Sequence, residues 1–140
     1  MTALSYTASK ISADQTQGAI VRNYEAAAAL TVGDLVALDN SGALTQADGN
    51  GTAAVARAIG VIVNSTSLYG ETAIASGQRC GVCVFGPVYG FSGLTPGAYG
   101  YVSDTAGKID DTMSSTNALA VGRALAADTF FINPGVADFS

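Results

Sequence analysis

Residues 35–45 read Leu-Val-Ala-Leu-Asp-Asn-Ser-Gly-Ala-Leu-Thr, and this stretch decides the fold class. Residues 35–38 form a short apolar run of the kind that makes a buried strand. Residues 39–42 predict a turn, because Asp and Asn side chains bond their own backbone and glycine accepts a positive φ. The chain then returns through residues 43–45, so the stretch predicts a β-hairpin.

Short apolar runs closed by turns continue along the whole chain. No amphipathic segment reaches the length of a good helix, and the alanine-rich residues 25–30 favour at most one helical turn. The β-branched run 55–63 predicts a strand in which Gly60 marks a bulge, and Gly86-Pro87 bends or ends another strand. Many short strands with closely spaced turns predict a compact all-β domain, a sandwich or barrel with little helix. The expected strands are 19–24, 35–38, 43–45, 55–63, 72–75, 79–84, 88–91, 99–103, 108–110, 118–125 and 129–133.

Two parts of the chain repeat the same order of features. Gly33 and Gly97 each precede a strand, which is followed by an Asp-led turn ending in glycine, a short return and a polar loop. Each part then ends in an apolar strand with an internal glycine, Gly60 in the first and Gly122 in the second. The order predicts two similar β units packed into one domain. Chance similarity is the alternative, since turns reuse the same residue types.

Composition excludes several classes of function. The chain has 140 residues, enough for one domain with its own core, and 12% of them are charged, against about a quarter in an ordinary globular chain. The six basic residues are scattered singly under a net charge of −5, which argues against nucleic-acid or anionic-membrane partners. The absence of histidine removes the commonest general base and metal ligand. We therefore expect no enzyme, no cofactor and no metal.

Three motifs have a chemical reading and a plainer one. Cys80 and Cys83 have the spacing of a redox pair, but residues three apart on a strand point to opposite faces. We expect two buried free thiols, with an intersubunit metal or disulfide as the alternative. Residues 49–54 fit the loose pattern G-x-G-x-x-A, but a strand pattern follows, which favours a surface loop over a nucleotide site. The clustered carboxylates are expected to be solvated turn residues rather than a calcium site or an acid/base pair: Asp104, Asp110 and Asp111.

The segment 1–18 differs from the rest of the chain. It is polar, and its only large apolar side chains are those of Met1, Leu4, Tyr6 and Ile11. The segment lacks the basic-then-apolar layout of a secretion signal. We expect residues 1–18 to be an N-terminal arm, either frayed or ordered only on a partner, ahead of a β-rich domain at 19–140.

Aromatic residues concentrate between positions 85 and 101. Phe85 is expected in the core. The other members are expected at a subunit interface, because tyrosine combines an apolar body with a polar tip and is enriched there. A place in the core is the alternative, since interface and core share this composition. These interface candidates are Tyr89, Phe91, Tyr99 and Tyr101.

A series of segments also carries a resemblance to a known family. The segments are residues 27–38 (Ala-Ala-Ala-Leu-Thr-Val-Gly-Asp-Leu-Val-Ala-Leu), 58–61, 70–74, 86–90, 94–97, 101–103, 106–109 and 121–125. In their order and spacing over residues 19–133, they resemble the small head-decoration, or capsid cement, proteins of tailed bacteriophages.

The resemblance implies a β-tulip-like or barrel-like fold and a homotrimer on the outer surface of the phage head. Such a protein binds the major capsid protein and clamps neighbouring capsid subunits; it is made in the host cytoplasm and ends in the virion. The N-terminal arm would order on the shell, with Leu4, Tyr6 and Ile11 as candidate capsid contacts. The family offers no catalytic residues to carry over.

Other classes of protein stay open on the sequence alone. One alternative is a tail or fibre module that binds receptors, and another is a cellular β-sandwich binding module. A small hydrolase using two carboxylates is a third, and it would need a deep pocket with two neighbouring acids.

Overall fold

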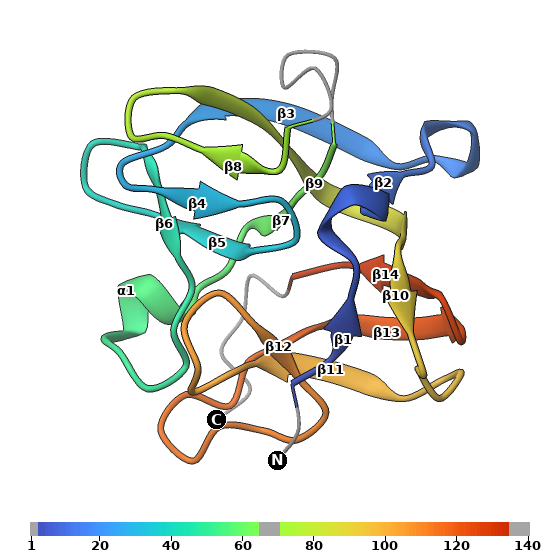
Figure 1. Cartoon of the computed structure of the whole chain (residues 1–140). Coiled ribbons are helices and arrows are strands. Elements are labelled where there is room, and N and C mark those ends of the chain that lie inside the picture. Colours follow the sequence, from blue (N-terminus) through green and yellow to red (C-terminus); the bar gives the residue numbers. More distant parts are fainter. Residues whose placement is uncertain (1–2, 65–70, 135–140) are drawn as a thin grey trace.

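The computed structural model describes residues 3–64 and 71–134, and a single curled β-sheet organises them (Figure 1). Its strand order is β12-β11-β13-β14-β9-β7-β5-β6, with β2 and β3 also paired to β9. Two small pairs, β1–β10 and β4–β8, complete the domain, which confirms the predicted all-β class. The strands are β1 (Ser5–Tyr6), β2 (Ser12–Ala13), β3 (Ile20–Glu25), β4 (Leu30–Thr31), β5 (Leu35–Leu38), β6 (Leu44–Gln46), β7 (Gly60–Ile62), β8 (Ala73–Ile74), β9 (Arg79–Tyr89), β10 (Phe91–Ser92), β11 (Tyr99–Val102), β12 (Ile109–Asp110), β13 (Ala120–Ala126) and β14 (Thr129–Ile132). Three short helices are η1 (Ala8–Lys10), η2 (Gln15–Gln17) and α1 (Ala53–Ala56).

Strand β9 is the longest, at 11 residues, and it joins the two sides of the molecule. Its first half pairs with β7 and β3, and its second half pairs with β14 and β2. Of the two outcomes expected at Gly86-Pro87, a bend or an end of the strand, the end does not occur, because β9 continues through both residues. The backbone of Pro87 faces the arm, where only its carbonyl forms a bond. This carbonyl accepts from the N–H of Asp14, so the missing N–H of proline leaves no pairing broken.

The predicted repeat is confirmed by the pairing register. In the first unit the pairs Leu35–Val61 and Val36–Gly60 join β5 to β7. In the second unit the pairs Tyr99–Arg123 and Gly100–Gly122 join β11 to β13 in the same way. Leu35 thus holds the position that Tyr99 holds in the second unit, and Val61 holds that of Arg123. The next strand in each unit corresponds as well, because the pair Val61–Cys83 joins β7 to β9 as the pair Arg123–Phe131 joins β13 to β14.

Backbone hydrogen bonds outside the strands follow the same correspondence. The N–H of Gly33 donates to the carbonyl of Ile62 at 2.8 Å, and the N–H of Gly97 donates to that of Ala124 at 2.7 Å. Glycine is required at the matching positions Gly60 and Gly122, because a Cβ there would run into the backbone carbonyl of the neighbouring strand. The two glycines singled out in the sequence therefore occupy one structural position, used twice.

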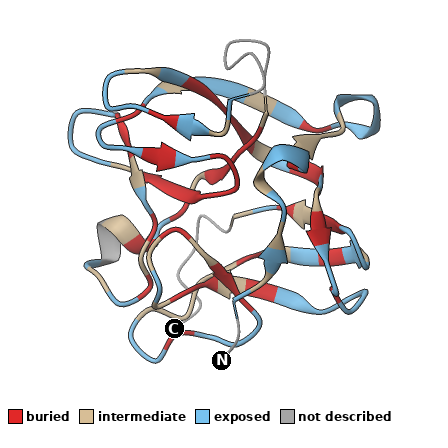
Figure 2. Cartoon of the chain, viewed as in Figure 1, coloured by how far each residue is buried: buried red, intermediate tan, exposed pale blue. Residues whose placement is uncertain are grey.

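Buried residues occur in both units (Figure 2), and the core they form is mainly aliphatic. Strands β5, β7 and much of β9 are buried, whereas β3 is exposed along most of its length. The largest fully buried side chains are Phe130, Ile11, Leu35, Leu44, Ile62, Ile74, Ile132, Val32, Val36, Val61 and Val63. Burial of this many apolar groups, at about 1.5–3 kcal/mol each, is the main favourable term in folding.

One expected strand is wrong in part. The run 55–63 does not form a continuous strand: the helical turn α1 covers Ala53–Ala56, and only Gly60–Ile62 extends as β7. The turn begins after Thr52, whose carbonyl accepts a bond from the N–H of Ala56. Alanine favours this local turn more strongly than the β-branched neighbours favour a strand. The alanines of 25–30, by contrast, form no helix.

The N-terminal arm lies against the body in this structure. Strand β1 pairs with β10, and β2 pairs with the second half of β9. Between them the side-chain amide of Asn64 donates to the carbonyls of Ala8, Ser9 and Ile11. The described part of the arm, residues 3–18, therefore pairs with its own domain in this structure.

Candidate interaction surface

Large apolar side chains gather on the outer side of β9, β13 and β14. Strand β14 explains how: successive residues point to opposite faces, so Phe130 enters the core while its neighbour Phe131 points outward. On β13, Ala124 is buried and Leu125 is exposed for the same reason. We call this surface the apolar face. It comprises Ile20, Phe85, Tyr89, Tyr99, Leu125 and Phe131.

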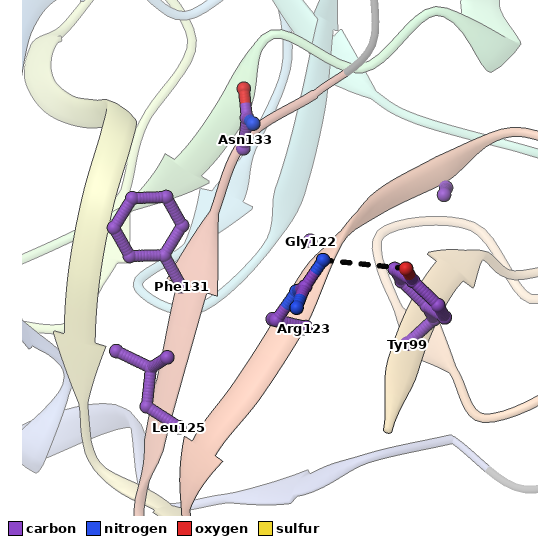
Figure 3. A pocket seen from close by; sticks show the side chains of 7 residues that line it. Tyr99, Gly122, Arg123, Leu125, Phe131 and Asn133 are labelled. Atoms are coloured by element: carbon purple, nitrogen blue, oxygen red, sulfur yellow. Dashed lines mark hydrogen bonds between the residues drawn. The ribbon is translucent and has the colours of Figure 1, made fainter. Parts of the chain in front are cut away.

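The centre of the apolar face is a groove that runs over β13 and β14 and beside Tyr99 of β11 (Figure 3). A hollow of ≈ 500 Å³ is lined by Tyr99, Arg123, Leu125 and Phe131. A second hollow of ≈ 370 Å³ runs toward Tyr89 and shares Leu125 and Phe131 with the first. The two hollows therefore form one continuous surface that is mostly apolar, with a polar group at each end. This composition is typical of protein interfaces.

At one end of the groove, Arg123 and Tyr99 hold each other in place. The guanidinium carbon of Arg123 lies 5.2 Å from the centre of the Tyr99 ring, and a guanidinium N–H donates to the Tyr99 hydroxyl at 3.3 Å (Figure 3). Both side chains are exposed. A cation over an aromatic ring contributes about 0.5–1 kcal/mol at such a site, enough to orient the two side chains without burying either.

At the other end, Tyr89 is tied to the N-terminal arm. Its hydroxyl donates to the carboxylate of Asp14 at 2.5 Å. The pKa of Tyr89 is raised by this hydrogen bond first and by lesser effects of its surroundings. The pKa of Asp14 is lowered, mainly by the hydroxyl of Thr16 and then by Tyr89. The arm and the apolar face therefore meet at a polar contact on the surface.

Phe85 was expected in the core, and this prediction is wrong. Its ring is 40% exposed and packs edge-on against Phe131, with centroids 5.1 Å apart. Ile20, its partner across β3 and β9, is exposed as well. Gly86, Pro87 and Val88 beyond it are buried again, so Phe85 is an exposed position within a largely buried strand and extends the apolar face.

The four predicted interface residues are placed in different surroundings. Tyr89 and Tyr99 lie on the apolar face. Phe91 is buried between Tyr6 and Phe130, each with a ring centroid 5.8 Å away, and so belongs to the core. Tyr101 is half-buried on β11. The structure thus brings two of the four together on one surface.

Leu125 and Phe131 were missed by the sequence analysis, although they form the centre of the groove. A signal was present in Phe130-Phe131: two adjacent aromatics on one strand point to opposite faces, so one of them leaves the core unless both faces are covered. Leu125 carried no comparable signal. Its exposure follows from the alternation of side chains along β13, where the neighbouring Ala124 takes the buried side.

The three candidate capsid contacts on the arm differ in burial. Ile11 is fully buried in the core. Tyr6 is half-buried: its ring packs against Phe91, and its hydroxyl accepts a bond of 2.9 Å from the ammonium of Lys108. Leu4 is half-buried and packs against the core. In this conformation, Leu4 and Tyr6 are partly accessible, whereas Ile11 is reached only if the arm leaves the body.

Reactive groups elsewhere in the described residues are held in structural roles. Cys80 and Cys83 are buried free thiols, as predicted, and burial raises the pKa of each to about 11. Residues 48–51 dock onto the loop after β12 through Ser114, whose hydroxyl donates to the carbonyl of Gly49. Asp110 is not solvated, in contrast to the prediction: it is buried and accepts a bond from the Ser103 hydroxyl at 3.0 Å.

The described residues offer no evident site for a metal ion or a nucleotide. Residues 3–64 and 71–134 contain no group of three or more acidic or cysteine side chains placed to hold a metal ion. The G-x-G-x-x-A segment precedes a helix of only four residues beside an antiparallel sheet, which is not the setting of a dinucleotide site. In the same part of the chain, no helix is both long enough and apolar enough to cross a membrane.

Comparison with known proteins shows a likeness in fold. The sequence matches no protein-family model and no curated protein. A solved chain in the structure called "The capsid of Myoviridae Phage XM1" has a similar fold, with a TM-score of 0.58 and 19% sequence identity. The likeness covers 95% of this chain and 91% of that chain. Because the identity is low, what is shared is the fold, along nearly the whole length of both chains.

Proposed function

We propose that this chain is a structural protein of a phage head, which binds the outer surface of the shell as a homotrimer and clamps neighbouring major capsid subunits. The observation that carries the proposal is the shared fold with a chain of a phage capsid over nine-tenths of both chains. Since so much of each chain is covered, the two proteins are also similar in length. The segments that resemble head-decoration proteins point the same way.

The apolar face supports an assembly of several copies. It is a continuous surface of exposed aromatic and aliphatic side chains, centred on Leu125 and Phe131. Exposed patches of this kind mark interaction sites in soluble proteins. Tyr89 and Tyr99 lie at its two ends, and we assign the contact between copies to this face.

The arm supplies a second contact, with the shell. Of the three candidate contacts on the arm, Leu4 and Tyr6 are partly exposed and available to a partner without rearrangement. Ile11 would reach the shell only after its side chain leaves the core, at a cost of about 1.5–3 kcal/mol. Many copies bound around one shell gain avidity, so each single contact can be weak.

The direct test is binding of the purified chain to shells assembled without it, followed by electron cryomicroscopy of the decorated particles. We expect trimeric density over three-fold positions on the outer surface. Density confined to the tail would contradict the proposal and favour a receptor-binding module. Failure to bind shells at any stage of maturation would contradict the capsid role altogether.

A further inference from the structure

The second unit of the repeat contains a strand position filled by the arm. Strand β2 lies along the outer edge of β9, where Ser12 pairs with Tyr89 and Ala13 pairs with Val88. The N–H of Asp14 then donates to the carbonyl of Pro87 at 3.0 Å. The second half of β9, which is the first strand of this unit, is therefore hydrogen-bonded on both edges: to β14 on one side and to the arm on the other.

In the first unit, the strand that corresponds to the second half of β9 is β3, so the outer edge of β3 corresponds to the edge that the arm occupies in the second unit. Strand β3 pairs with the first half of β9 as the second half of β9 pairs with β14. The counterparts of Pro87, Val88 and Tyr89 are Val21, Arg22 and Asn23, in that order. Within residues 3–64 and 71–134, no strand pairs with the outer edge of β3. The first unit thus has an open position where the second unit holds a strand.

The alternation of backbone groups shows which atoms this edge presents. The carbonyl of Gly81 accepts from the N–H of Val63 and so faces β7. Its neighbours on β9 face β3 instead, and their partners Arg22 and Tyr24 direct their N–H and C=O groups toward β9. The alternate residues, Asn23 among them, direct theirs outward. Val21 and Asn23 correspond to Pro87 and Tyr89, whose backbone groups face the arm. The repeat therefore also places the N–H and C=O groups of Asn23 on the outer edge of β3.

We propose that the outer edge of β3 accepts an extended segment of the shell subunit as an added antiparallel strand. This inference rests on the proposed function and names a surface that the shell would use. The pairing of β2 with β9 in the second unit defines the geometry, so the added segment runs antiparallel to β3. Small side chains like those of Ser12 and Ala13 would lie opposite Asn23 and Arg22. Main-chain hydrogen bonds provide the affinity in this mode of recognition.

The polarity of the edge favours another protein over a second copy of the chain. Arg22, Asn23 and Glu25 are all exposed, whereas charged residues are depleted from the centre of interfaces between identical copies. Charges along an edge strand also oppose pairing of the edge with itself. The carbonyl of Asn23 accepts a bond of 3.2 Å from the guanidinium of Arg79, and its second lone pair is left for an incoming N–H.

The test compares Asn23→Pro with Asn23→Ala in binding to shells assembled without this protein. Proline removes one outward N–H and blocks the approach of a strand, but it keeps every bond to β9 and is tolerated on the open side of an edge strand. We expect Asn23→Pro to bind shells at least about tenfold more weakly, and Asn23→Ala to bind within about twofold of wild type. Thermal unfolding followed by circular dichroism checks that both variants fold.

Amide hydrogen exchange of the wild-type chain is a second measurement, independent of whether Asn23→Pro folds. We expect the Asn23 amide to exchange fast in the free protein and slowly on the shell, and the Arg22 amide to exchange slowly in both. Equal shell binding by wild type and Asn23→Pro, or a fast Asn23 amide on the shell, would overturn the inference and leave the proposed function intact. Loss of self-association in Asn23→Pro with normal shell binding would assign the edge to a second copy. Absence of shell binding by wild type would instead contradict the proposed function.

Discussion

The hydroxyl of Tyr89 lies 2.5 Å from a carboxylate oxygen of Asp14 and joins the apolar face to the turn that carries the arm. The same carboxylate accepts from the backbone N–H and the hydroxyl of Thr16, at the start of η2. One aspartate thus holds the turn and fastens it to β9. The arm contact therefore depends on pH at both ends of the scale.

The Tyr89 hydroxyl is expected to titrate above the ordinary tyrosine pKa of about 10, because its hydrogen bond to Asp14 stabilises the neutral form. The contact is complete below about pH 10 and is lost as the pH rises through the raised pKa. At the acid end it is complete above about pH 4 and is lost as the pH falls through the lowered pKa of Asp14. The phenolate absorbance difference between wild type and Tyr89→Phe measures the alkaline midpoint. In an Asp14→Asn background the midpoint should fall, and an unchanged midpoint would show that the bond is absent in solution.

Ile11→Ala is expected to lower the free energy of unfolding by about 2–4 kcal/mol, because the side chain is fully buried and its loss leaves a cavity. Leu4→Ala is the matched control on the same arm, and its cost should be smaller because Leu4 is half-buried. Denaturant unfolding of the two variants supplies the numbers. Equal and negligible effects would mean that the arm does not pack on the body in the free protein.

Leu125→Asp is expected to lower the mass of the assembly without unfolding the chain, because it places a charge in the centre of the apolar face. Met113→Asp is the control: Met113 is similarly exposed, at 56% against 50% for Leu125, and does not line the groove. Light scattering coupled to size exclusion measures both masses. If both variants keep the wild-type mass, the contact between copies lies elsewhere.

Gly60→Ala is expected to destabilise the domain by more than about 3 kcal/mol, because the added Cβ meets the backbone carbonyl of Cys83, which cannot yield as a flexible side chain would. Gly42→Ala is the comparison, since Gly42 has open space around it and only its φ of +83° is strained for alanine. That strain costs about 1 kcal/mol. Thermal melting in parallel should rank the two variants in this order, and the reverse ranking would show that β7 and β9 lie farther apart than described.

Both cysteines are expected to resist thiol reagents in the folded protein at about pH 8, because burial raises the pKa of each to about 11 and leaves almost no thiolate. A disulfide-exchange reagent should release no colour within minutes from the native chain and two equivalents in denaturant. Fast reaction of one equivalent in the native state would indicate that β9 opens locally near Cys80 or Cys83.

The local parts of the fold could be predicted from the sequence because their causes are local. The turn at 39–42 and the matching glycines Gly60 and Gly122 depend on residue chemistry that any chain expresses. The repeat followed from the order of these features. Its register could not be predicted, because register depends on which distant strand each residue meets.

The arm and the apolar face show where sequence reasoning ends. The arm is held by Asn64, which lies far from it in the sequence, and nothing around Ile11 signals that contact. Tyr89 and Tyr99 were predicted for an interface from residue type alone. Phe85 was assigned to the core on its hydrophobicity, and its exposure follows from the path of β9 past Gly86, where the backbone of Ala19 packs against the strand.

Strand β9 ends the first unit and begins the second without any linker between them. Duplicated domains joined by a flexible segment can lose one half while the other survives. Here, unravelling either unit removes a strand from its neighbour, so we expect the two units to melt in one cooperative transition. A load applied to one unit is therefore carried directly into the other along a single stretch of backbone.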